Sequence, residues 1–152
     1  WEFLFVAIDD HSRTAFTQLY PDERKESAVS FLHAATHYFA SLNTPIQRLI
    51  TDNGSAFRSQ AFRIACHTLA IAYRFTRAYR PQTNGKAERF IQSALREWAY
   101  GQAYPTSDQR RAALPAWTHF YNCHRPHLGI GGQVPVSRLP ILPGNNLLTL
   151  HS

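Results

Sequence analysis

Two short stretches of the sequence place a pair of acidic residues, Asp52 and Glu88, on rigid elements. In the first stretch, Leu49–Gly54, an apolar strand is predicted to end at Asp52, and a sharp Asn-Gly turn follows. The second stretch, Tyr79–Phe90, begins with a basic loop that contains Pro and Gly. A helix is predicted to follow this loop, with Glu88 in its first turn. Two carboxylates held beside a basic loop are suited to divalent-metal phosphoryl transfer.

Asp52 and Glu88 each also fit a purely structural role. An aspartate before Asn-Gly accepts hydrogen bonds from the backbone of its own turn. A glutamate in the first turn of a helix interacts favourably with the helix dipole. Each role alone is common, but the two acids together, with residues 53–87 between them and both flanking motifs, favour a shared metal site.

The residues Thr51–Gly54 and Pro81–Phe90, at this separation, resemble the catalytic core of insertion-sequence DDE transposases and retroviral integrases. The resemblance extends from Trp1 to about Pro135. It implies a ribonuclease-H-like fold, a mixed sheet flanked by helices, and metal-dependent strand cleavage and transfer at DNA ends. It also implies that Asp52 and Glu88 are catalytic and bind Mg²⁺ or Mn²⁺.

The family's site has a third acidic residue, on the first strand of the fold. The resemblance aligns Phe3–Arg13 with the second strand and the turn after it, so we expect the first strand and its aspartate to precede Trp1. Asp9 and Asp10 are the alternative within the sequence. Their setting favours turn residues whose carboxylates accept local backbone hydrogen bonds.

The missing first strand has a structural consequence. In the ribonuclease-H-like sheet this strand is central, between the second strand and the strand that leads to Asp52. Without it, Phe3–Ile8 and Ile46–Thr51 each expose an unpaired edge. We therefore expect the chain to be poorly stable, to dimerise through these edges or to close the two strands onto each other, and to lack strong metal binding and strand transfer.

Basic residues are concentrated around Glu88, and the formal net charge of +6 suggests a polyanionic partner such as DNA. Lys86 and Arg89 share a predicted helix face with Arg96. We expect this stripe to lie beside the carboxylates and to contact DNA phosphates; a merely solvated face is the alternative. The loop Tyr79–Gly85 is expected to be more mobile than the core. The predicted DNA-binding residues, some of them implied by the resemblance alone, are Arg77, Arg80, Gln82, Thr83, Asn84, Lys86, Arg89 and Arg96.

The order of predicted elements is that of an α/β protein. The unbroken apolar run Phe3–Ile8 predicts a strand buried on both faces. Residues 1–135 form the predicted integrase-type core, truncated at its N-terminus, and 136–152 an irregular tail. The other predicted elements are strands at Thr14–Tyr20, Ile46–Thr51 and Ile71–Thr76, and helices at Arg24–Leu42, Ser59–Leu69, Lys86–Tyr100 and from Thr106 onward, the last interrupted or kinked at Pro115.

The cysteines and histidines are not predicted to form a disulfide framework or a metal site. Cys66 and Cys123 form no disulfide framework, which favours a reducing cytosol. The resemblance implies that this is a bacterial cytoplasm and that the protein is associated with the nucleoid. No apolar run approaches the ~18 residues of a membrane span. His124 and His127 lack further ligands at a zinc spacing. The pattern Tyr121–His127 resembles the closing motif of the same cores and is interpreted as structural.

Three functions remain open from the sequence. The first is a transposase core that acts on the DNA ends of its own element, as a homo-oligomer on DNA. The second is a non-catalytic remnant that binds DNA, or co-assembles with intact transposase and inhibits it. The third is a metal-dependent nuclease of the same fold, against which the residues around Glu88 argue.

Overall fold

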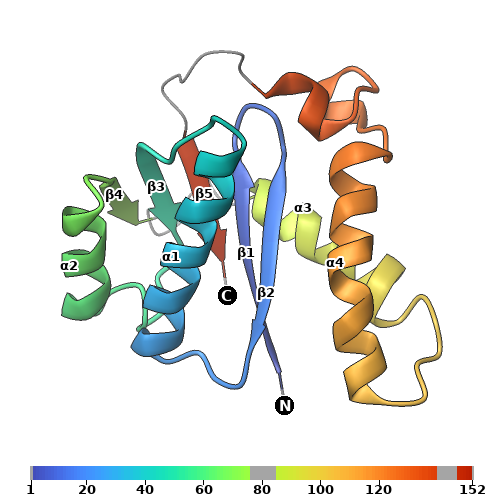
Figure 1. Ribbon diagram of the computed structural model, residues 1–152, viewed down its shortest axis with the longest axis horizontal. Coiled ribbons are helices and arrows are strands. Elements are labelled where there is room, and N and C mark those ends of the chain that lie inside the picture. Colours follow the sequence, from blue (N-terminus) through green and yellow to red (C-terminus); the bar gives the residue numbers. More distant parts are fainter. Residues whose placement is uncertain (1, 76–84, 140–146, 152) are drawn as a thin grey trace.

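A five-stranded mixed sheet forms the centre of the computed structural model, which describes residues 2–75, 85–139 and 147–151 (Figure 1). The strand order is β2-β1-β5-β3-β4. β1 is antiparallel to both of its neighbours, and β3 is parallel to both of its own. The α/β class predicted from the sequence is confirmed. The strands are β1 (Phe3–Asp9), β2 (Ala15–Tyr20), β3 (Arg48–Thr51), β4 (Ala72–Phe75) and β5 (Leu147–His151).

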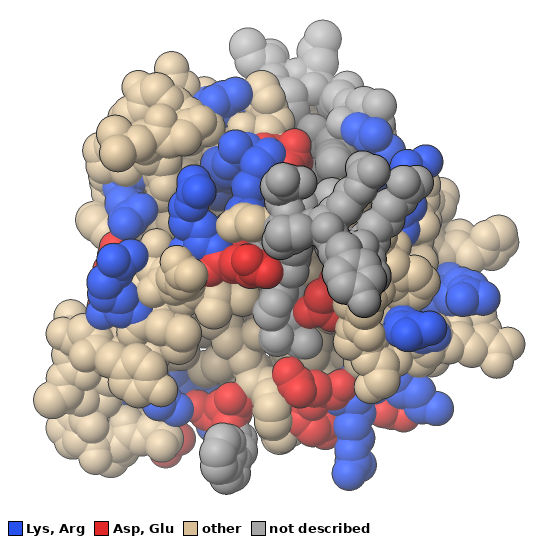
Figure 2. Space-filling model, turned by 180° about the vertical axis from the view of Figure 1, so that it is seen from behind, with Lys and Arg blue, Asp and Glu red and all other residues tan. Residues whose placement is uncertain are grey.

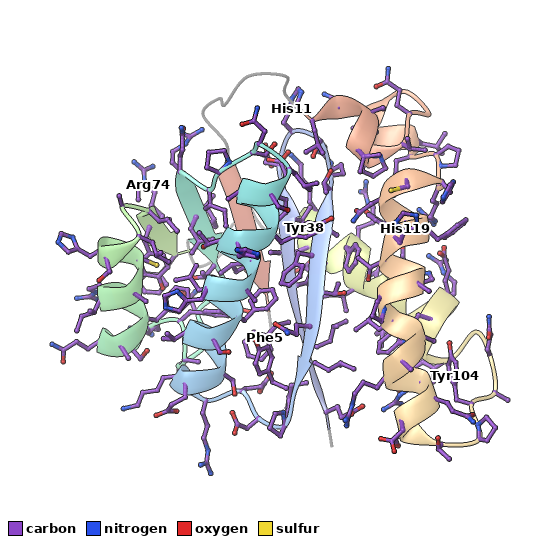
Figure 3. All side chains as sticks on the ribbon, in the orientation of Figure 1. Phe5, His11, Tyr38, Arg74, Tyr104 and His119 are labelled. Carbon is purple, nitrogen blue, oxygen red and sulfur yellow. The ribbon has the colours of Figure 1, made fainter. Side chains whose placement is uncertain are left out.

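The apolar run in β1 is buried on both faces of the sheet, as predicted. Successive side chains of a strand point to opposite faces. Phe5 and Ala7 therefore join one core cluster, with helices α1 (Lys25–Ser41) and α2 (Gln60–Thr68). Figure 3 shows Phe5 between the sheet and α1. Val6 and Ile8 join the second cluster, with α3 (Gly85–Ala94) and α4 (Ser107–Cys123).

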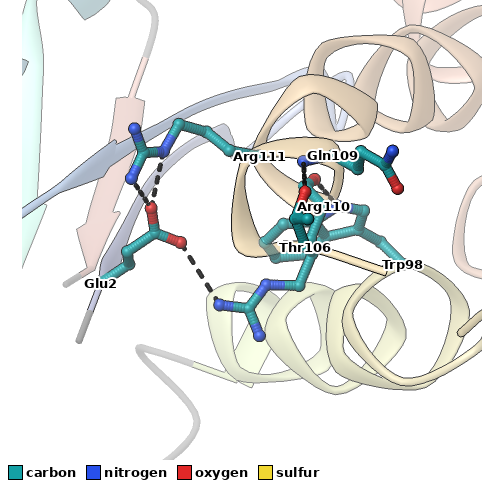
Figure 4. Close-up of polar contacts among 6 residues, drawn as sticks. All are labelled: Glu2, Trp98, Thr106, Gln109, Arg110 and Arg111. Atoms are coloured by element: carbon teal, nitrogen blue, oxygen red, sulfur yellow. Dashed lines mark hydrogen bonds and ion pairs between the residues drawn. The ribbon is translucent and has the colours of Figure 1, made fainter. Parts of the chain in front are cut away.

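Local hydrogen bonds fix the starts of two helices at the predicted residues. The Ser59 hydroxyl accepts a hydrogen bond from the Phe62 N–H, 3.2 Å away, where α2 begins. The Thr106 hydroxyl accepts one from the Gln109 N–H at the start of α4, also at 3.2 Å (Figure 4). Each bond satisfies an N–H that has no partner within the helix. Of the helices that the structure describes, none is long and apolar enough to cross a membrane.

Polar contacts tie the start of β1 and the extension of α3 to α4 (Figure 4). α3 continues as a π-helical turn, Leu95–Ala99, from which the Trp98 indole N–H donates to the Arg110 carbonyl oxygen at 2.9 Å. The Glu2 carboxylate accepts hydrogen bonds from the guanidinium groups of Arg110, at 3.3 Å, and Arg111, at 2.6 Å. These contacts fix α4 relative to the face of the sheet that α3 covers.

Pro115 does not interrupt α4, contrary to one form of the prediction. The helix is continuous from Ser107 to Cys123. Pro115 lies on the exposed face, so the carbonyl that it leaves without a helix partner can bind water. Leu114 and Tyr121, on the inner face, are buried in the second core cluster.

The predicted irregular tail contains a strand at the centre of the sheet. Pro135–Arg138 forms a 3₁₀ turn, and β5 pairs antiparallel with β1 and parallel with β3. Leu150 is fully buried in the first core cluster. The prediction that two strand edges stay bare, or close onto each other, is therefore wrong. A short apolar strand satisfies the backbone groups of both edges at once.

Candidate nucleic-acid-processing site

Asp52 lies directly after β3, at the carboxyl end of that strand, as the sequence predicts. Its Oδ1 accepts a hydrogen bond from the Gly54 N–H at 2.8 Å, so the side chain is oriented by its own turn. A Cβ at position 54 would lie 2.8 Å from the same oxygen, which explains why a glycine fits there. The turn role and a ligand role are thus compatible, because the turn fixes the direction of the carboxylate.

Glu88 lies in the first turn of α3 and is exposed. The neighbouring residues Ala87, Phe90 and Ala94 are buried in the second core cluster and hold the helix against the sheet. An acidic residue at this position is stabilised by the positive end of the helix dipole. Glu88 is therefore presented to solvent from a firmly packed helix.

The elements that carry the two predicted ligands both contact β5. Asp52 follows β3, which pairs with β5 along its whole length. α3, which carries Glu88, packs against both β1 and β5. The start of α3 is also held near the turn after β1, because Lys86, two residues before Glu88, pairs with Asp10.

Asp9 and Asp10 lie at the other end of the sheet from Asp52. Asp9 is opposite Leu148, which in turn is opposite Leu49, three residues before Asp52. This register separates the Asp9 and Asp52 rows by ~10 Å along the strands, far beyond the ligand distances of one metal ion. The Asp9 carboxylate accepts a hydrogen bond from the Ser12 N–H at 3.0 Å, as the turn interpretation predicts.

The basic stripe on α3 lines a pocket whose described lining does not include Glu88. Lys86 forms an ion pair with Asp10, in the turn between β1 and β2. Together with Arg89 and Arg96 it lines a pocket of about 400 Å³. At 3.6 residues per turn, Glu88 lies roughly a third of a turn around the helix from this stripe. The expected stripe is present on α3, and its position beside the two carboxylates stays a prediction.

Some of the predicted DNA-binding residues lie outside the described part of the chain. Most of the loop Tyr79–Gly85, which is predicted to be mobile, also lies outside it. The DNA-binding role of these residues and the mobility of the loop stay predictions. These residues are Arg77, Arg80, Gln82, Thr83 and Asn84.

The motif Tyr121–His127 makes the structural contacts that were predicted for it. The buried Asn122 side chain both accepts from the Ala15 N–H and donates to the Ala15 carbonyl oxygen, each at 2.8 Å, and so fixes the start of β2 to α4. His127 Nε2 lies 3.3 Å from the Tyr121 carbonyl oxygen. Burial lowers the pKa of His127 and raises that of Tyr121 to about 12.

Two residues that the sequence did not mark as functional share the pocket with the stripe, namely Arg13 and Arg125. Arg13 is in the turn between β1 and β2, and Arg125 follows α4. Neither lies near Glu88 in sequence, so only the fold brings them to α3. The composition of the motif, with its Arg-Pro pair after the helix, was the available signal for Arg125.

The donor chemistry of Asp52 and Glu88 suits Mg²⁺ or Mn²⁺, which prefer hard carboxylate oxygens. Within residues 2–75, 85–139 and 147–151, no group of three or more His, Cys, Asp and Glu side chains is placed to hold a metal ion. The donor atoms of the described residues are thus of the type that the implied metal prefers. Asp52 and Glu88 are two of the three carboxylates that the resemblance implies.

Two overlapping parts of the chain match family descriptions. Residues 1–81 match one integrase core domain family, and residues 69–135 match a second family with the same description. The first match covers more than half of the chain.

Curated relatives come from mobile elements and viruses. The putative integrase ORF3 of Spiroplasma virus SpV1-C74 is 25% identical over 150 residues, which cover 90% of this chain and 41% of the relative. The Insertion element IS136 uncharacterized protein Atu4601 of Agrobacterium fabrum is 30% identical over 78 residues, 51% of this chain and 40% of the relative. The Gag-Pol polyprotein of avian reticuloendotheliosis virus is 30% identical over 89 residues, 59% of this chain and 8% of the relative. The chain spans less than half the length of each.

Solved structures share the fold. The catalytic core domain of BIV integrase superposes with a TM-score of 0.70 at 24% identity, covering 90% of this chain and 84% of that chain. A chain of the simian T-cell lymphotropic virus intasome gives a TM-score of 0.67 at 26% identity, covering 93% of this chain and 51% of that chain. The sheet and its helices therefore have the ribonuclease-H-like architecture of retroviral integrase cores. The chain belongs to the integrase core domain family, the transposase and integrase catalytic cores of the retroviral integrase superfamily.

Proposed function

We propose that this chain is the catalytic core of a bacterial insertion-sequence transposase, which cleaves DNA strands at the ends of its element and transfers them to target DNA. The observation that carries the proposal is the match of residues 1–81 to the integrase core domain family, in a chain that has Asp52 directly after β3 and Glu88 in the first turn of α3. Membership of the integrase core family and the insertion-element relative support DNA ends as the substrate.

The proposed roles follow from where the side chains lie. Asp52, oriented by the Gly54 N–H, and Glu88, presented by α3, are the ligands for Mg²⁺ or Mn²⁺. A divalent metal held by Asp52 and Glu88 would supply the charge needed to activate a water or a 3′-hydroxyl group and to stabilise the leaving oxygen at the phosphodiester. The cations of α3 and of the loop before it hold DNA phosphates.

The two carboxylates neutralise and position a metal pair less well than three would. We therefore expect the 152-residue chain alone to be a poor catalyst. The active protein is expected to act as a homo-oligomer on DNA.

One observation favours the non-catalytic alternative for the chain as it stands. β5 fills the central position of the sheet, and none of its residues is acidic. A chain that closes its sheet in this way can bind DNA, or join an assembly of intact transposase and inhibit it, without completing a metal site.

Strand transfer on DNA ends tests the proposal. The 152-residue chain is assayed with Mg²⁺ or Mn²⁺ beside a version extended by the coding sequence upstream of Trp1. In the extended version, Asp52→Asn and Glu88→Gln should each abolish transfer. Glu26→Gln, which removes an exposed first-turn glutamate of α1, should not.

Full activity of the Asp52→Asn and Glu88→Gln variants would overturn the proposal. Inhibition of intact transposase by the short chain, with no transfer by the extended version, would instead establish the non-catalytic alternative.

A further inference from the structure

A basic pocket lies between α3 and the segment after α4. Its volume is about 400 Å³. Its described lining includes five cationic side chains from three separate parts of the chain. Figure 2, which shows the molecule from behind, has Lys and Arg side chains gathered on the upper left of that face. The five cations are Arg13, Lys86, Arg89, Arg96 and Arg125.

The pocket keeps positive charge after its internal ion pairs are taken into account. Lys86 pairs with Asp10, and Arg125 pairs with Glu97. Arg13, Arg89 and Arg96 form no ion pair with a residue of the described ranges. Three positive charges that converge on one cavity repel one another, and a bound anion relieves that repulsion.

Two of the pocket's guanidinium groups, those of Arg13 and Arg125, are held in place before any ligand binds. Arg125 donates from Nε and from a terminal nitrogen to the same Glu97 oxygen, at 3.1 and 2.7 Å, and lies 5.8 Å from the centre of the Tyr121 ring. The Arg13 guanidinium donates to the Asp10 carbonyl oxygen. Fixed guanidinium groups lose less conformational freedom when they bind an anion, and their planar fork matches the oxygens of a phosphate group.

We propose that this pocket binds a phosphate group, with the backbone of a DNA segment as its source, at a site separate from the Asp52–Glu88 carboxylates. The identification of DNA rests on the proposed function, whereas the phosphate chemistry rests on the pocket alone. Such a contact positions DNA on the protein and is independent of base sequence.

DNA binding in EDTA tests the pocket without involving the metal site. The salt dependence of duplex affinity is measured for Arg13→Asn and Arg96→Gln. Asn suits position 13 because its φ of 68° is in the left-handed region, where Asn is tolerated. Each variant should lower the slope of log K against log salt by about 0.9, the value for one lost phosphate contact.

Arg63→Gln is the matched control, because it removes one exposed arginine from α2, a helix of the other core cluster. Its slope should fall by less than that of either pocket variant. Thermal unfolding of each variant checks that the fold is retained.

A second arm separates DNA from free phosphate. Inorganic phosphate is titrated at constant ionic strength while the His127 ring signal, assigned with His127→Gln, is followed by NMR. A phosphate-dependent shift that Arg13→Asn abolishes, with unchanged DNA slopes, supports a site for a free phosphate. Two results together would overturn the proposal. In these, the pocket variants have the same salt dependence of DNA affinity as Arg63→Gln, and their His127 signal responds to phosphate as in the wild type. The catalytic roles proposed for Asp52 and Glu88 would be untouched by that result, because they are tested separately by strand transfer.

Discussion

Leu150 of β5 lies opposite Thr51 of β3, the residue that directly precedes Asp52. Through this pairing the last strand of the chain supports the strand end from which the predicted metal ligand projects. β5 thus takes the central place that was expected for a strand preceding Trp1. The closed sheet, and the position of Asp52 within it, depend on residues almost a hundred positions further along the chain.

Leu150→Ala should destabilise the fold by about 2–5 kcal/mol, because it removes a fully buried side chain and leaves a cavity between the sheet and its helices. Urea-induced unfolding measures the change. Ile64→Ala, at an exposed position of α2, should change stability by no more than about 0.5 kcal/mol. Equal stabilities for these two variants would show that β5 does not close the sheet.

Gly54→Ala should weaken metal binding more than it weakens the fold. The added Cβ would lie 2.8 Å from Asp52 Oδ1, so the carboxylate must move from its present direction. Gly129→Ala is the control, since a Cβ there meets nothing within 4 Å. Isothermal titration with Mn²⁺ measures the effect, and unchanged affinity in Gly54→Ala would mean that the orientation of Asp52 by its turn is irrelevant to the metal.

Glu2 should contribute to stability in a pH-dependent way. Hydrogen bonds from Arg111, and then Arg110, hold the pKa of the Glu2 carboxyl below its ordinary range. Because the folded-state pKa is the lower one, the stabilisation is present above the unfolded-state pKa and is lost as the pH falls through the folded-state pKa. Glu2→Gln should therefore be less stable than wild type at neutral pH, and the difference should shrink in acid.

Thermal unfolding from neutral to acidic pH measures this difference. Glu23→Gln, an exposed glutamate, is the comparison. A difference between Glu2→Gln and wild type that stays constant with pH would contradict the assigned ion pairs.

Local signals in the sequence predicted much of the fold. The run Phe3–Ile8 indicated a strand buried on both faces, because only such a strand needs apolar residues at every position. Ser59 and Thr106 marked helix starts, since a capping side chain acts on its own helix. The turn role of Asp9 was likewise readable from the residues next to it.

Contacts between distant parts of the chain were not predictable in this way. The strand Leu147–His151 follows a segment rich in Pro and Gly, and its pairing partners, β1 and β3, lie about a hundred residues or more before it in the sequence. The spacing of Lys86 and Arg89 showed that they share a helix face, but not that Arg13 and Arg125 complete a pocket with them. Pro115 is tolerated because its side of α4 faces solvent, which only the packing reveals.

The central claim is that Asp52 and Glu88 bind one divalent metal site. Its most direct test is Mn²⁺ binding followed by electron paramagnetic resonance, in the short chain and in the version extended upstream. Asp52→Asn and Glu88→Gln should each weaken binding by at least about tenfold, and the double variant should be little worse than either single one, because both remove the same site. Glu26→Gln should bind as wild type does. Equal Mn²⁺ affinity in wild type and in the double variant would contradict the account.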